Sequence, residues 1–414
     1  MIYAQELSPL KSQCKEGIYL RMNAANGYRW VILGLATFCI LTFGVVFQSV
    51  PPILGILVDV LHVSYAQAGA LMGLFVVPAI FLSIPGGMLA DRYGERKVGV
   101  AALLIMAFGT AVVAMNESYW VIGFGRLVAG IGAAVLLVVT PRVVTSWFYD
   151  REIGQAMGFF NISMPLGTIL SLNFMGVIAN RFNWQASIWT SFASTMAALC
   201  LFLLLFKSKE MDGGVKSEPL SLRGVIKAVG WRIWMVGLSW GLFNAGLISF
   251  FTYAPDFFVS QGEEIAKAGL LASYPMWGSI ILAPIVGLLI DRIGRKWLFV
   301  SVGSGGIAIL LYLIPGLTHH ATILCIAIGV FVALLVPAIF SLPAELLPGR
   351  VMGFGFGILG TAVGIGISVG PYIVGSLRDA TGNYLWSFAA MAIFSFLGII
   401  PMFTLKLAGS ESLS

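Results

Sequence analysis

The sequence predicts an all-α integral membrane protein, with twelve transmembrane helices arranged in two pseudo-symmetric six-helix halves. Three observations indicate this fold: an unusually apolar composition, twelve separate apolar segments, and a motif that returns at an offset of 200 residues. Of the 414 residues, 59% are hydrophobic and only 10% are charged, whereas a soluble domain carries about 25% charged residues. The mean hydropathy is +0.95. The composition therefore excludes a water-soluble globular protein.

Apolar runs of about 18 residues or more with few charges are typical of membrane-spanning helices. Such segments are expected near residues 29–50, 67–89, 98–115, 119–141, 152–178, 184–206, 232–258, 266–290, 297–316, 320–343, 350–377 and 384–406. Pro51 and Pro52 are expected to end the first of them. The only long polar connection, residues 207–231, contains Gly213, Gly214 and Pro219 and reads as a linker.

These segments give a simple organisation of the chain. We expect an N-terminal tail (1–28), an N-terminal half (29–206), a cytoplasmic linker (207–231), a C-terminal half (232–406) and a short C-terminal tail (407–414). The first 28 residues lack the short apolar core and cleavage site of a secretory signal, which favours a cytoplasmic tail.

The basic residues predict the orientation. Twenty of the 24 Lys and Arg fall on the side of the two termini, three fall on the other side (Arg181, Lys267 and Arg378), and Arg126 lies within a segment. This bias predicts that both termini are cytoplasmic, in the cell membrane. Because the positive charge is spread over many loops, it favours a role in topology and a lipid bilayer as partner rather than nucleic acid.

The sequence contains no recognisable motif for catalysis, metal binding or phosphate binding. The four cysteines are far apart, no pair has metal-ligand spacing, and the three histidines fall in or beside connections. No phosphate-binding loop or nucleophile constellation can be identified. We therefore expect no enzymatic activity, no metal and no cofactor.

A duplicated motif marks the ends of two apolar segments. The stretch GGMLADRYGERKVG begins at Gly86, and GLLIDRIGRKWLF begins at Gly287. Asp91 returns as Asp291 and Gly94 returns as Gly294, each 200 residues later. Asn183 and Asn383, before the sixth and twelfth segments, repeat the same offset. This periodicity indicates two copies of one architecture.

With these motifs, nearly the whole chain resembles the major facilitator superfamily of secondary transporters. Its loop signature G-x-L-x-D-R-x-G-R-K occurs twice, with Glu95 standing where a basic residue is usual, and its R-x-x-x-G-x-G element occurs as Arg126, Gly130 and Gly132. The resemblance implies alternating access around a solute site between the halves, near the bilayer midplane. It also implies that the first, fourth, seventh and tenth helices surround the cavity.

The repeated charges are candidates for a gate. We expect Asp91 to pair with Arg142, and Asp291 to pair with Arg350 or its neighbourhood, where Glu345 adds a carboxylate. The resemblance implies that such pairs latch the cytoplasmic ends of the two halves together when the cavity faces outward; the alternative is that the charges only set topology. The expected gating residues are Gly87, Asp91, Arg92, Gly94, Arg142, Asp291, Arg292, Gly294, Glu345 and Arg350.

Arg126 is the one charge expected deep in the hydrocarbon, roughly 10 Å from the membrane boundary at 1.5 Å per residue. No carboxylate lies at a comparable depth, which favours an anionic solute held by the planar guanidinium. The alternative is that Arg126 binds helix carbonyls or Gln48 and only positions its helix. Other candidates for solute binding are Gln48, Asn161, Trp240, Asn244, Tyr253, Tyr274 and Thr361.

The leading hypothesis is a monomeric secondary active or facilitative transporter of a small anionic organic solute. A coupling proton or an exchanged anion is left open as a further partner. One alternative is export of lipophilic or cationic compounds, for which the 29 phenylalanines and 11 tryptophans would supply an aromatic cavity. Another is a non-transporting membrane sensor on a transporter fold, which would be expected to carry an appended signalling domain.

Overall fold

The computed structural model is a helical bundle in two halves, and it describes residues 7–148, 152–207, 230–348 and 351–410. The N-terminal half comprises α1 (Leu7–Phe47), η1 (Pro51–Ile53), α2 (Leu54–Leu61), α3 (Tyr65–Tyr93), α4 (Glu95–Ala114), α5 (Tyr119–Phe148), α6 (Ile153–Arg181) and α7 (Trp184–Leu205). The C-terminal half comprises α9 (Arg232–Ser260), α10 (Ile265–Ile293), α11 (Lys296–Leu313), η2 (Ile314–Gly316), η3 (Thr318–His320), α12 (Ala321–Leu346), α13 (Met352–Thr381), α14 (Leu385–Leu397) and α15 (Ile400–Ser410).

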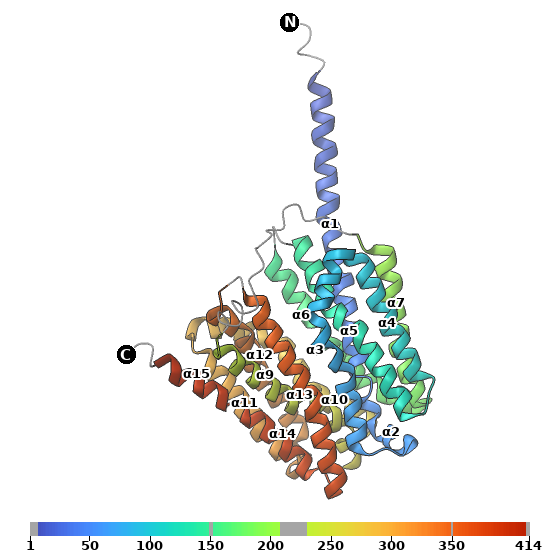
Figure 1. Ribbon diagram of the computed structural model, residues 1–414, viewed down its shortest axis with the longest axis vertical. Helices are drawn as coiled ribbons and strands as arrows, with labels where there is room; N and C mark the ends of the chain where they lie inside the picture. The colour runs from blue at the N-terminus through green and yellow to red at the C-terminus, as the bar shows by residue number, and fades with distance from the viewer. Residues whose placement is uncertain (1–6, 149–151, 208–229, 349–350, 411–414) are drawn as a thin grey trace.

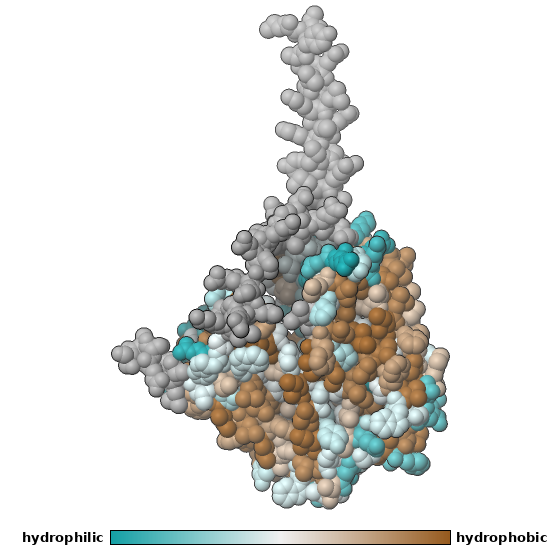
Figure 2. All heavy atoms as spheres, in the orientation of Figure 1, coloured by the Kyte–Doolittle hydropathy of each residue, from teal (hydrophilic) through white to brown (hydrophobic). Residues whose placement is uncertain are grey.

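Twelve stretches of the described residues are long and apolar enough to cross a membrane. This number confirms the prediction of twelve transmembrane helices. Figure 1 shows the two halves side by side, with the first part of α1 projecting beyond the bundle, and Figure 2 shows broad hydrophobic areas on the face in view. The exposed apolar side chains suit contact with lipid, since a surface of this kind is unfavourable in water.

The predicted end of the first span was wrong, and the last span, Leu385–Lys406, agrees with the prediction but contains a break that was not predicted. Pro51 and Pro52 do interrupt the first span, but a short 3-10 turn leads into α2, and the apolar span runs from Gly27 to Leu61. Proline lacks the main-chain donor of a helix interior but is accepted in a first turn, which explains why the chain breaks and then continues. The last segment is likewise divided, with α14 ending at Leu397 and α15 starting at Ile400.

The repeated asparagines begin corresponding helices. Asn183 Oδ1 accepts the amide of Ala186 at 2.7 Å at the start of α7, and Asn383 Oδ1 accepts the amide of Leu385 at 3.0 Å at the start of α14. A side-chain oxygen at this position satisfies an amide that the helix itself leaves unbonded. The 200-residue repeat therefore has the same local function in both halves.

Two pairs of helices form the main contacts between the halves: α3 packs on α13, and α6 packs on α10. We call these the α3–α13 seam and the α6–α10 seam. We call the end of the bundle near residues 91–95, 205–207 and 291–296 the terminal face, and the opposite end, near residues 61–65, 260–265 and 381–385, the distal face. The positive-inside prediction would make the terminal face cytoplasmic.

Candidate transport site and gates

Arg126 lies on α5 and is almost fully buried, with 2% of its surface exposed. Its guanidinium donates to three main-chain carbonyls: Nε to Leu71 at 3.1 Å, Nη1 to Val46 at 2.8 Å and Nη2 to Phe47 at 3.0 Å. Ser49 Oγ at 3.5 Å and Met72 Sδ at 3.8 Å accept weaker contacts, and the ring of Phe75 lies 4.5 Å from the guanidinium carbon. Each nitrogen of the guanidinium thus has an acceptor nearby.

Two of the three carbonyls that Arg126 binds, those of Val46 and Phe47, belong to the last turn of α1, where the first span is broken. α1 ends at Phe47, and the last carbonyls of a helix have no partner within it. A cation at a helix C-terminus also interacts favourably with the helix dipole. Arg126 therefore caps the end of α1 and ties it to α3 and α5.

In this structure the side chain of Arg126 binds helix carbonyls, as in the alternative that the sequence left open. The predicted contact of Arg126 with the solute stays a prediction. An anion could reach the guanidinium only by displacing these carbonyls, and each displaced bond is a hydrogen bond to a charged group, worth about 1.5–3 kcal/mol.

The other predicted solute-binding residues do not form one site with Arg126. Gln48 is buried at the break, with no partner for Oε1 within the described part of the chain. Asn244 donates to the carbonyl of Trp240 in its own helix at 2.8 Å. Asn161 is exposed on α6, while Tyr274 and Thr361 are half-buried on α10 and α13.

Trp240 belongs to an aromatic cluster in the C-terminal half. Its ring stacks on Phe243 with centroids 5.1 Å apart and meets Phe340 of α12 edge-on at 5.2 Å. Phe340 lies parallel to Phe356 of α13 at 6.4 Å. Phe340 and Phe356 remain about two-fifths exposed. The cluster therefore offers aromatic surface contributed by three helices.

The expected pair of Asp91 and Arg142 is present on the terminal face. Arg142 Nη2 donates to Asp91 Oδ1 at 2.5 Å, and Nη1 donates to the carbonyl of Gly87 at 3.1 Å. Both residues belong to the N-terminal half, so the pair fastens α5 to α3 rather than one half to the other. The expected latch between the halves concerns the outward-facing state and stays a prediction.

The C-terminal half has a different pair at the corresponding end. Glu345 accepts Lys296 Nζ at 2.7 Å, and this pair also stays within one half. Asp291 and Arg292 are exposed, and Arg350 lies outside the described residues, so the expected pair of Asp291 with Arg350 stays a prediction. Gly94 and Gly294 have φ of +84° and +70°. These positive φ angles, which glycine adopts without steric cost, let the chain reverse sharply at both positions.

The distal face carries polar contacts between the halves that the sequence did not reveal. Asp379 of α13 accepts the amides of Tyr65 and Ala66 at the start of α3, at 2.8 and 2.9 Å. The hydroxyl of Tyr253 lies 2.9 Å from the carbonyl of Tyr65 and 2.7 Å from that of Pro371. Tyr253, predicted to bind solute, therefore contributes to closure of the distal face.

Asp256 adds a half-buried carboxylate at the same end. It accepts a hydrogen bond from Tyr384 and lies against Gly55, where an added Cβ would collide with Asp256 Oδ1. Burial, followed by the charge of Asp256, raises the pKa of Tyr384 well above its usual value, so this phenol keeps its proton and donates.

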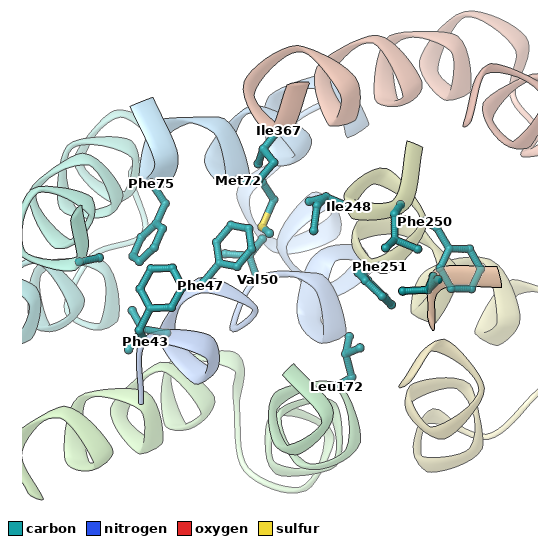
Figure 3. Packing of buried hydrophobic residues seen from close by; sticks show 14 of the residues in the cluster. Phe43, Phe47, Val50, Met72, Phe75, Leu172, Ile248, Phe250, Phe251 and Ile367 are labelled. Carbon is teal, nitrogen blue, oxygen red and sulfur yellow. The ribbon is translucent and has the colours of Figure 1, made fainter. Parts of the chain in front are cut away.

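Beneath these polar contacts, apolar side chains from both halves converge. Figure 3 shows Met72 of α3 beside Ile367 of α13, with Val50, Leu172 and Phe251 in the same layer. A small cavity of about 190 Å³ lies on the distal side, lined by Pro51, Gly55, Asp59, Tyr65, Leu172, Asp256 and Gly269 among others. The path between the halves is therefore blocked near the distal face.

Comparisons with known proteins agree on the family. The model of the Major Facilitator Superfamily matches residues 33–264 and again 261–413. A probable sulfoacetate transporter, SauU of Cupriavidus necator, is 24% identical over 345 residues, covering 77% of this chain and 80% of that protein. The nitrite extrusion protein of Bacillus subtilis is 26% identical over 358 residues, covering 83% and 87%.

Transporters with other names share the same architecture. The lysosomal dipeptide transporter MFSD1 of Danio rerio is 24% identical over 403 residues, covering 90% of this chain and 86% of that protein. The crystal structure of a mutant of the nucleoside transporter NupG superposes with a TM-score of 0.74 at 15% identity, covering 91% of this chain and 99% of that one. The matches to the family model span nearly the whole sequence, and this chain therefore belongs to the Major Facilitator Superfamily of membrane transporters.

Proposed function

We propose that this protein is a secondary active or facilitative transporter that moves a small anionic organic solute across the cell membrane by alternating access, with both termini cytoplasmic. One observation supports the mechanism above all: the polar bonds between the halves gather at the distal face, whereas the ion pairs of the terminal face stay within each half. Contacts gathered at one end are expected of a conformation that is closed on that side, which is one of the two end states of alternating access.

The anionic solute is supported by charge and by the relatives. The two bacterial relatives are named for sulfoacetate and nitrite, which are both anions. The basic residues crowd toward the terminal face, and the side chain of Arg142 there is 37% exposed. Positive charge on the terminal face would raise the local concentration of anions there. We assign no enzymatic reaction to the chain.

We further propose that Arg126 acts on the solute site indirectly. By holding the end of α1 it fixes the position of the break beside Gln48, whose buried Oε1 has no partner in the part of the chain that is described. The residues that contact the solute then come from α1 and from the helices of the C-terminal half that carry Trp240 and Thr361.

A thermal-shift screen of the purified full chain tests the substrate class. The probes are sulfoacetate, nitrite, acetate and dialanine, with tetraphenylphosphonium as a lipophilic cation. A solute that binds only the folded state raises the melting temperature, equivalent to about 2.7 kcal/mol at a hundred times its Kd. Uptake of the stabilising anion into proteoliposomes, in an exchange format, then shows transport. Stabilisation by the cation alone would contradict the anionic assignment.

The aromatic cluster around Trp240 supports a second candidate function, export of lipophilic or cationic compounds. Aromatic faces attract cations and bury apolar surface. Under this candidate, Trp240→Ala abolishes the stabilisation by tetraphenylphosphonium, whereas Trp234→Ala, in the same helix, retains it. Under the anionic assignment, the cation has no effect on either variant.

A further inference from the structure

The first turn of α3 is capped by a carboxylate from the other half of the protein. The two oxygens of Asp379 accept the two successive amides of Tyr65 and Ala66, at 2.8 and 2.9 Å. A carboxylate at a helix N-terminus is stabilised by both the unbonded amides and the helix dipole. Ser64 Oγ accepts the amide of Gln67 at 3.2 Å, so the local cap and the cap from Asp379 together satisfy this turn.

The surrounding side chains fit this arrangement closely. An added Cβ on Gly69 or on Gly375 would collide with the hydroxyl of Tyr253. Both positions need glycine for the hydroxyl to reach the carbonyls of Tyr65 and Pro371. The guanidinium carbon of Arg378 lies 5.1 Å from the ring of Tyr65. Main chain, phenol and carboxylate therefore meet in one cluster that spans both halves.

The α6–α10 seam has no such cap at the equivalent place among the described residues. At the 200-residue offset, Asp379 corresponds to Ala179 and Tyr65 corresponds to Ile265. Gly69 corresponds to Gly269, which packs against the carbonyl of Leu172. The polar contact found in this seam is a bond of 3.0 Å from Asn173 to Ser273. The two seams therefore both pack closely at the equivalent glycine, but the α3–α13 seam carries a carboxylate where the α6–α10 seam has an alanine.

We propose that Asp379 is the latch of the distal gate, a residue that holds the α3–α13 seam closed by capping a helix of the opposite half. The proposal rests on the alternating-access function above. When the distal face opens, the start of α3 leaves α13, and water takes over the bonds of both partners. The cap therefore stabilises the distal-closed state selectively, and its loss shifts the population toward the distal-open state.

Distance measurements between two spin labels test the latch. Ser118→Cys and His319→Cys place labels on exposed distal positions of the two halves, with Cys14 and Cys200 replaced by serine and the buried Cys39 and Cys325 retained. In the full chain in lipid nanodiscs without solute, we expect Asp379→Asn, which removes the charge and one of the two accepting oxygens, to raise the long-distance population roughly five-fold, the effect of losing a negative charge at a helix N-terminus. Asp59→Asn, which removes an exposed carboxylate on the same face, leaves the distribution unchanged.

Amide hydrogen exchange reports directly on the two bonds from Tyr65 and Ala66 to Asp379. Amide exchange of the peptide that contains Tyr65 and Ala66 accelerates in Asp379→Asn, while the peptide at the start of α10 exchanges as in the native chain. Tyr253→Phe, which removes one hydroxyl without changing the packing, produces a smaller shift in the same direction. This second variant keeps the test decisive if Asp379→Asn fails to fold.

The outcomes separate the latch from the function on which it rests. A native chain that shows two distance populations, neither of them altered by Asp379→Asn or Tyr253→Phe, overturns the latch alone. A chain that shows one population in every variant and with every anion tested contradicts alternating access itself.

Discussion

Arg126 and Val46 are joined by a 2.8 Å hydrogen bond from the guanidinium Nη1 to the main-chain carbonyl, at the point where the first membrane span breaks. The bond explains why a charge can lie in the middle of an apolar protein. Two of the three carbonyls that Arg126 binds lie at the broken end of α1, so both the cation and the helix end gain hydrogen bonds that lipid cannot supply. The buried charge of Arg126 and the break in the first span therefore stabilise each other.

Arg126→Ala should destabilise the protein strongly, because three hydrogen bonds from the buried guanidinium to the carbonyls of Val46, Phe47 and Leu71 would be lost. We expect a loss on the order of 3 kcal/mol or more, measured as a lower melting temperature in detergent. Arg142→Ala, at a partly exposed site, should change stability far less. A folded Arg126→Ala variant with the native melting temperature but no response to anions would restore the direct solute role.

Asp91→Asn should cost less than about 1 kcal/mol, since the side chains of Asp91 and Arg142 are 65% and 37% exposed and the pair is hydrated. The double variant Asp91→Arg with Arg142→Asp should recover most of that loss. Chemical denaturation measures both effects. Because the pair lies within one half, neither variant should move spin labels placed across the terminal face; a movement there would show that the pair does act between the halves.

Gly269→Ala should favour the distal-open state without unfolding either half. An added Cβ would collide with the carbonyl of Leu172 across the α6–α10 seam, and only separation of the helices can relieve this overlap. Gly287→Ala, in the same helix, meets nothing within 4 Å and is the matched control. Labels at Ser118 and His319 report the shift; equal distance distributions in the two variants would refute it.

Gly130→Ala should prevent correct folding of the N-terminal half. Its Cβ would overlap the carbonyl of Phe75, in the middle of the contact between α5 and α3. Gly158→Ala meets nothing within 4 Å, and alanine is the better helix former. Size-exclusion profiles of the two variants should therefore differ sharply, and a monodisperse Gly130→Ala protein would contradict this account of the packing.

The sequence predicted the elements of this fold well because membrane spans are set by one dominant property. A run of apolar residues long enough to cross the bilayer must be helical, since lipid offers no hydrogen bonds to the main chain. The first span is the exception that shows the limit. Residues 51–61 continue it beyond two prolines, and no periodic pattern marks a helix that restarts after a single 3-10 turn.

The candidate site was harder to predict because charge in a sequence does not say which way a side chain points. Arg126 was correctly identified as the deep cation, but its acceptors are carbonyls, which every residue carries and no sequence pattern distinguishes. Asp379 was missed for a similar reason, since its partners are the amides of Tyr65 and Ala66. The one available signal was its mismatch with Ala179 in the repeat.

The broken first span has a mechanical consequence. Its long segment, α1, is fastened to α6, where Gly44 and Gly167 bring the two main chains together, while its short segment lies against α9 of the other half through Gly55 and Asp256. A continuous straight helix fixed to both halves would resist the rotation of one half relative to the other. A span with a hinge at residues 48–53 allows its two segments to move with different halves. Arg126 holds the position of this hinge while the two segments rotate.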